Sequence, residues 1–128
     1  MSLKDSLRIM VVDDMTVSRG LVTQALEELG IFHVATEASG RAALSRLAAD
    51  PVHLVLADYN MPGMDGLQLL EGLRRNRSTQ RIGYILVTGT PTPELIQKGQ
   101  QLGLNNMVRK PFTTATMKKA IEAVVGRL

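Results

Sequence analysis

Residues with reactive or metal-binding side chains follow four separate apolar runs of this 128-residue sequence. They are Asp13 and Asp14 after "LRIMVV", Asp58 after "VHLVLA", Thr88 at the end of "YILVT", and Lys110 after "NMVR". Three neighbouring carboxylates repel one another and raise one another's proton affinity unless a cation lies between them. Mg²⁺ suits such a site, because it prefers oxygen ligands and is typically held by one or two carboxylates together with a phosphate.

The remaining two side chains complement this acidic group. Lys110 supplies a point positive charge and Thr88 a hydroxyl donor, which together suit the non-bridging oxygens of a phosphoryl group. A carboxylate flanked by a metal, a lysine and a hydroxyl is placed to act as a nucleophile. We therefore expect Asp58 to form an aspartyl phosphate.

The elements that must position these residues alternate along the chain. Short apolar runs predict strands at 7–12, 32–36, 52–57, 84–88 and 106–109. Apolar residues at helical spacing, with capping signals at Asp65 and Thr92, predict helices at 16–29, 39–49, 65–73 and 92–103 and a fifth through 117–128.

Five such strand–helix units predict an α/β fold with a doubly wound, five-stranded parallel sheet in the order 2-1-3-4-5 and five helices. Ligands of these sheets lie at the carboxyl ends of the strands, where the strand order reverses. The first and third strands are neighbours in this order. Asp13, Asp14 and Asp58 should therefore meet in one small pocket.

Composition excludes several other classes of protein. The chain is 45% hydrophobic and 21% charged, which predicts one domain over residues 1–128. It has 0 cysteines, so disulfides, thiolate metal sites and cysteine nucleophiles are excluded. The apolar runs are strand-sized, which predicts a soluble, cytoplasmic protein with no membrane partner. The net charge is +3, but only 3% of residues are aromatic and the basic residues are scattered, which disfavours nucleic-acid binding.

Four sequence fragments, in this order on alternating units, carry a resemblance to a known family. They are "VVDD" at 11–14, "DYNMPGMDG" from Asp58, "VTG" with Thr88 and "RKPF" with Lys110. Over essentially its whole length the chain resembles the receiver domain of two-component response regulators, in particular the single-domain, CheY-like chemotaxis type. The resemblance implies the flavodoxin-like fold with the strand order given above.

The resemblance also implies a role for each site residue. Asp58 would accept a phosphoryl group from a phosphohistidine of a sensor histidine kinase, here a chemotaxis kinase. Thr88 would bind the phosphoryl group and shift on activation, and Lys110 would neutralise its charge. Asp13, Asp14 and Asp58, with the backbone carbonyl of Asn60, would hold Mg²⁺. The family also has a cis peptide bond before the proline that follows this lysine, which is Pro111 here.

Two positions depart from the family pattern. Met107 stands where receivers commonly carry a tyrosine or phenylalanine, and a thioether can fill a gap but has no hydroxyl. Gly89 follows Thr88 where a small residue, often alanine, is usual, so this loop is conformationally freer. Both departures concern the readout of the switch and leave the phosphorylation chemistry intact.

The sequence therefore predicts a monomeric switch in which Mg²⁺-dependent phosphorylation changes affinity for a protein target such as the flagellar motor switch. It would assist its own phosphorylation and dephosphorylation without turning over a separate substrate, so it would not be an enzyme. The resemblance also implies a partner face made by the fourth helix, the fifth strand and the last helix, which would include Lys98, Met107, Lys118 and Lys119.

Other functions remain open from the residues alone. A phosphate sink or a receiver excised from a larger regulator would keep the same chemistry. A small haloacid-dehalogenase-type phosphatase would carry its nucleophile in Asp-x-Asp after the first strand, where this chain has two adjacent aspartates. A flavodoxin-like cofactor module would need hydroxyls and amides in its first loop, which here reads "DDMTVS".

Overall fold

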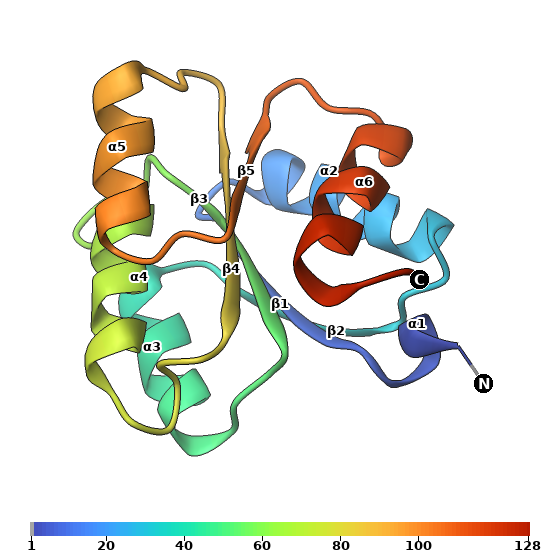
Figure 1. Ribbon diagram of the computed structural model, residues 1–128, viewed down its shortest axis with the longest axis horizontal. Coiled ribbons are helices and arrows are strands. Elements are labelled where there is room, and N and C mark those ends of the chain that lie inside the picture. The colour runs from blue at the N-terminus through green and yellow to red at the C-terminus, as the bar shows by residue number, and fades with distance from the viewer. Residues whose placement is uncertain (1) are drawn as a thin grey trace.

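A five-stranded parallel sheet forms the centre of the molecule (Figure 1). In the computed structural model, which describes residues 2–128, its strands lie in the order β2-β1-β3-β4-β5. Their bounds are β1 Arg8–Val12, β2 His33–Glu37, β3 Leu54–Asp58, β4 Gly83–Thr88 and β5 Asn106–Arg109. The predicted strand order is confirmed, and each predicted strand exists with ends shifted by two residues or fewer.

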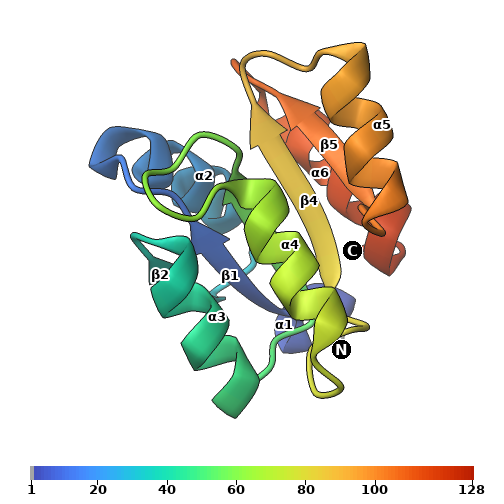
Figure 2. The same ribbon diagram turned by 90° about the vertical axis from the view of Figure 1, so that its left-hand side faces the viewer.

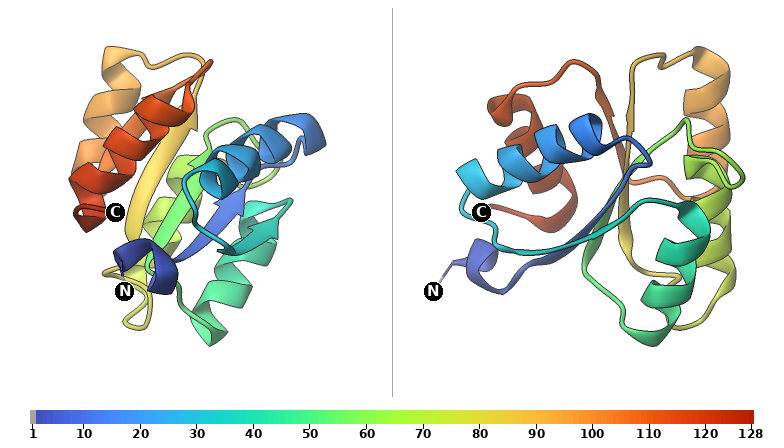
Figure 3. Two further views of the ribbon diagram at one scale, coloured as in Figure 1. Left: turned by 90° about the vertical axis from the view of Figure 1, so that its right-hand side faces the viewer. Right: turned by 180° about the vertical axis from the view of Figure 1, so that it is seen from behind.

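Helices cover both faces of the sheet (Figures 2 and 3). One face carries α3 (Gly40–Ala49), α4 (Gly66–Arg75) and α5 (Pro93–Gln101), and the other carries α2 (Thr16–Glu28) and α6 (Thr114–Val125). The prediction of five helices was wrong by one, because the one-turn helix α1 (Leu3–Ser6) precedes β1. It begins with a capping box between Ser2 and Asp5, and four residues are too few to show helical periodicity.

The side chains of the central strands alternate between two hydrophobic cores, because successive residues of a strand point to opposite faces. Met10, Val55 and Leu86 face α3, α4 and α5, whereas Ile9, Leu56 and Ile85 face α2 and α6. The strand β3 is buried along its whole length. Its carboxyl end is thus a rigid place for a reactive group.

Local capping fixes the helices that begin near the carboxyl ends of the strands. At α4, the Asp65 side chain accepts from the backbone N–H groups of Leu67 and Gln68, and the Gln68 side chain accepts in return from the N–H of Asp65. At α5, Thr92 caps the helix and Pro93 follows at its first position. Both predicted caps are confirmed.

The peptide bond between Lys110 and Pro111 is cis, which confirms the expectation from the family resemblance. Among residues 2–128, no helix combines the length and apolar character needed to cross a bilayer.

Candidate functional site

The strand register brings the predicted acidic residues to one edge of the sheet. Val12 of β1 lies beside Ala57 of β3, so the residues that follow each of them meet at the carboxyl end of the sheet. The backbone N–H of Asp13 continues the ladder by donating to the carbonyl of Glu37 at 3.1 Å. Carboxylate oxygens of Asp13, Asp14 and Asp58 all lie within 4.8 Å of one another. The predicted convergence of these three residues is therefore present.

Asp13 is held by the first turn of α2. One carboxylate oxygen, Oδ1, accepts from the backbone N–H of Met15 at 3.0 Å, and the Asp13 carbonyl accepts from the Arg19 guanidinium at 2.6 Å. The Asp13 side chain is 2% exposed. The first contact holds one oxygen of the buried carboxylate, and the second holds the backbone that carries it, so the side chain has little rotational freedom.

Two oxygens of the acidic group fit a metal ion. Asp13 Oδ2 and Asp14 Oδ1 are buried and have no hydrogen-bond partner among the described residues. A buried carboxylate oxygen left in this state is costly unless a cation completes its surroundings. The donor set consists of oxygens alone, which is the set that Mg²⁺ prefers.

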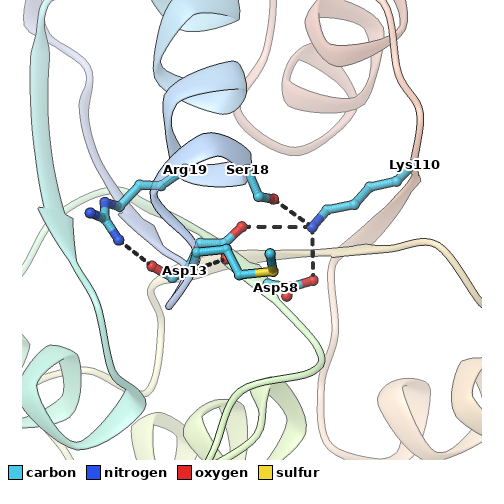
Figure 4. A network of polar contacts seen from close by, with 6 residues as sticks. Asp13, Ser18, Arg19, Asp58 and Lys110 are labelled. Carbon is cyan, nitrogen blue, oxygen red and sulfur yellow. Dashed lines mark hydrogen bonds and ion pairs between the residues drawn. The ribbon is translucent and has the colours of Figure 1, made fainter.

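Lys110 reaches the acidic group from the far side of the site (Figure 4). Its backbone N–H donates to the Thr88 carbonyl at 2.8 Å, so the end of β4 positions the residue. Its ammonium, Nζ, donates to Asp58 Oδ1 at 3.1 Å and to the Ser18 hydroxyl at 2.7 Å. It also lies 3.6 Å from Asp13 Oδ2. One cation thus faces two of the three carboxylates.

Burial raises the pKa of the Asp58 carboxyl above its ordinary value of 3.8. The hydrogen bond and positive charge of Lys110 oppose this shift, whereas the nearby charge of Asp13 adds to it. The net direction of the pKa is upward, so the site disfavours the charged form of Asp58. Such a group gains from bonding to an electrophile or from a nearby cation.

The start of α4 lies directly against Asp58. The backbone N–H of Gly66 donates to the Tyr59 carbonyl at 2.9 Å. A Cβ atom on Gly66 would lie 2.5 Å from the Asp58 carbonyl oxygen and 2.6 Å from Leu86 Cδ1. Only glycine allows this close approach, which sets the path of the chain as it leaves β3.

Thr88 and Asn60 lie at the carboxyl end of the sheet, and no hydrogen bond or ion pair joins them to the acidic group within residues 2–128. Thr88 is fully buried at the end of β4, and its hydroxyl accepts from the Thr90 N–H at 3.1 Å. Asn60 is exposed in the connection between β3 and α4. The roles assigned to these two residues stay predictions.

The sequence analysis missed Ser18 and Arg19, the two residues of α2 that contact the site. Helical spacing offered no signal, because Asp14 precedes the helix that carries Ser18. Nothing in the sequence indicates that Ser18 meets Lys110, since 92 positions separate them. A cavity of about 440 Å³ opens beside Ser18 and Lys110, between α2 and residues 110–114.

Known proteins resemble this chain over nearly its whole length. The family model of the response regulator receiver domain matches residues 9–122. The chain is 39% identical to the "Probable chemotaxis protein CheY" of Rhizobium etli over 128 residues, which span 100% of this chain and 99% of that protein. It is 32% identical to "Chemotaxis protein CheY-3" of Vibrio cholerae, covering 98% of this chain and 97% of that one.

Solved structures share the fold. Chemotaxis protein CheY4 of Vibrio cholerae superposes with a TM-score of 0.86 at 28% identity, over 93% of this chain and 98% of that chain. The receiver domain of a Pseudomonas aeruginosa sensor histidine kinase, which has a magnesium ion coordinated in its active-site cleft, superposes with a TM-score of 0.84. It covers 94% of this chain and 98% of that chain at 23% identity, which is a likeness of fold alone.

The family model and the relatives match nearly the whole chain. The strand order and the three converging carboxylates with the facing lysine fit the same family. The chain belongs to the response regulator receiver family.

Proposed function

We propose that Asp58 is the phosphoacceptor of a chemotaxis-type response regulator and that residues 1–128 form one receiver domain. The observation that carries this proposal is the Lys110 ammonium, 3.1 Å from Asp58 Oδ1, within a group of three convergent carboxylates. A lysine that only stabilised the fold would not need carboxylate oxygens without hydrogen-bond partners beside it. A site that binds a metal ion and a phosphoryl group needs such free oxygens as ligands.

In the reaction, a carboxylate oxygen of Asp58 attacks the phosphorus of a phosphohistidine on the donor kinase. The new O–P bond forms as the P–N bond breaks, and the electron pair leaves with the donor imidazole. Lys110 stabilises the negative charge on the transferring group, because an ammonium aimed at the developing charge lowers the barrier. Hydrolysis then returns the carboxylate, when water attacks the phosphorus and the bond to the Asp58 oxygen breaks.

Asp13, Asp14 and Asp58, with the Asn60 carbonyl, are the residues that would hold Mg²⁺. The bound ion supplies positive charge for the phosphoryl oxygens. The two unpartnered buried oxygens of Asp13 and Asp14 support this assignment. Asp13 Oδ1 would stay with the Met15 N–H, which leaves Oδ2 for the ion.

The output of this site is a change in partner affinity, with Thr88 responding to the phosphoryl group. The donor would be a chemotaxis kinase in the cytoplasm, and the target a protein such as the flagellar motor switch. The protein would work as a monomer and would turn over no separate substrate. In a phosphate sink, the alternative output, Asp58 would drain the same kinase without a target.

Intact mass after incubation with acetyl phosphate tests the proposal. With Mg²⁺, we expect the native protein to gain one phosphoryl group, and we expect no gain without Mg²⁺ or in Asp58→Asn. Asp50→Asn is the matched control, because Asp50 is an exposed aspartate paired with Arg8 away from the site. It should be phosphorylated like the native protein.

Failure of the folded native protein to gain the group would contradict the proposal. Steady release of phosphate from a simple phosphomonoester would favour the phosphatase instead.

A further inference from the structure

Ser18 makes the shortest of the three polar contacts around the Lys110 ammonium. Its hydroxyl oxygen accepts from Nζ at 2.7 Å, compared with 3.1 Å to Asp58 Oδ1 and 3.6 Å to Asp13 Oδ2. Figure 4 shows the serine reaching from α2 and the lysine from the chain after β5. This contact joins α2 to the segment that carries Lys110.

The Lys110 ammonium thus donates hydrogen bonds to Ser18 and Asp58 and forms a longer ion pair with Asp13. Two of these three partners change during the proposed reaction. Asp13 Oδ2 is a candidate metal ligand, and Asp58 becomes an acyl phosphate. The Ser18 hydroxyl takes part in neither change, so it is the one partner that can hold the ammonium throughout.

The position of Ser18 itself is fixed. Its helix packs into the core through Val22, Ala25 and Leu26. The next residue, Arg19, ties the same turn to the Asp13 carbonyl at 2.6 Å. A hydroxyl on a rigid element holds a flexible four-carbon side chain more precisely than one on a loop would.

The lysine needs such a hold because it has room to move. The cavity of about 440 Å³ beside the site is lined by both Ser18 and Lys110, together with Leu21 and Phe112. A side chain that lines an open cavity has alternative rotamers available to it, each pointing its ammonium away from Asp58.

We propose that Ser18 is a positioning residue that holds the Lys110 ammonium toward Asp58 during phosphoryl transfer. The inference rests on the proposed phosphoacceptor function of Asp58. Because the transferring group carries similar charge when it arrives and when it is hydrolysed, loss of Ser18 should slow both steps.

The kinetic test compares Ser18→Ala with Ser18→Thr, which keeps a hydroxyl. With acetyl phosphate and Mg²⁺, we expect the rate constants for phosphorylation and for loss of the phosphoryl group each to fall about fivefold in Ser18→Ala. Ser18→Thr should restore most of both rates. Thr23→Ala is the control, because the Thr23 hydroxyl is exposed on the same helix and donates to the Gly20 carbonyl.

A second measurement does not depend on phosphorylation. In the phosphoryl-free protein, NMR relaxation of the Lys110 Cε group should show greater ps–ns mobility in Ser18→Ala than in the native protein and in Thr23→Ala. A helix that was merely destabilised would not loosen this one side chain.

The outcomes separate the two proposals. Native rates and native Lys110 mobility in Ser18→Ala would overturn the role of Ser18 and leave Asp58 as the phosphoacceptor. A native protein that gains no phosphoryl group would overturn the proposed function, and the mobility measurement would still show whether Ser18 orders the lysine.

Discussion

At the scale of single residues, the charge of Asp58 has a cost. The carboxyl is buried beside Asp13, and burial raises its pKa above the ordinary 3.8. Between pH 3.8 and the higher pKa of the folded state, Asp58 holds its proton more often in the folded protein than in the unfolded chain. The contribution of Asp58 to stability therefore falls as the pH rises through this range. At neutral pH the ionised group opposes folding.

Removing this charge should therefore stabilise the protein. We expect Asp58→Asn to raise the Tm of the metal-free protein by about 3–5 °C at pH 7. The gain should shrink as the pH falls toward 4, because the native carboxyl then becomes protonated and loses its penalty. Thermal unfolding followed by circular dichroism between pH 4 and pH 7 measures the difference.

Asp50→Asn again serves as the control, since Asp50 is exposed and should change the Tm little. Adding Mg²⁺ should raise the Tm of the native protein more than that of Asp58→Asn, because an ion that binds only the folded state stabilises it by mass action. A lower Tm for Asp58→Asn in metal-free buffer would show that the Lys110 pair outweighs burial.

The sequence allowed some of these residues to be predicted because their positions depend on the strands. Asp13, Asp58 and Lys110 each follow a recognisable strand, and parallel strands end at the same edge of a sheet. Ser18 could not be found in this way, and neither could the contacts of Arg74, a residue of α4 that lies outside the site. Arg74 donates to the carbonyls of Gln80, Ile82 and Gly103 and to the Asn105 side chain, contacts set by packing between distant elements.

At the scale of elements, the contact of α4 with the end of β3 links the helix to the site. Gly66→Ala would place a Cβ atom 2.5 Å from the Asp58 carbonyl oxygen, where backbone cannot yield easily. We expect this variant to lose about 1–3 kcal/mol of unfolding free energy and to be phosphorylated more slowly, because Asp58 must move. Chemical denaturation and acetyl phosphate kinetics test the two effects.

Gly20→Ala is the matched control within a helix. A Cβ atom on Gly20 would meet nothing within 4 Å, and alanine in a helix interior is more stable than glycine by about 0.5–1 kcal/mol. It should therefore stabilise the protein and leave phosphorylation unchanged. Equal effects of the two substitutions would remove the argument that α4 sets the path of the chain beyond Asp58.

The elements also show where sequence patterns are informative. Continuous apolar runs and capping signals predicted every strand and the five long helices, because burial and local hydrogen bonds leave direct marks on the sequence. The ends of β2 and β3 lay one or two residues from the prediction, since the pairing of neighbouring strands decides them. The helix α1 depends on one capping box and has no buried residue to mark it.

At the scale of the whole molecule, charge is distributed unevenly. Three of the 12 acidic residues are gathered in the site, so basic residues predominate over the rest of the surface. Lys98 on α5 and Lys118 and Lys119 on α6 are exposed. Beside α6, a hollow of about 290 Å³ is lined by residues of β5, of the segment that follows it and of α6, with Met107 and Arg109 among them. Exposed lysines on α5 and α6, with a partly apolar hollow beside α6, suit an acidic protein surface that presents an apolar side chain.

Charge reversal at this face should therefore weaken partner binding without affecting the acidic site. We expect Lys98→Glu combined with Lys118→Glu to lower affinity for the partner histidine kinase about tenfold at low salt, and less at high salt because screening reduces surface charge effects. Phosphorylation by acetyl phosphate should keep its native rate.

The control is Arg41→Glu combined with Arg75→Glu, which makes the same change of net charge on the exposed surface of α3 and α4. If both pairs weaken binding equally, net charge steers the encounter. If only the first pair does, the face formed by α5, β5 and α6 is the docking surface.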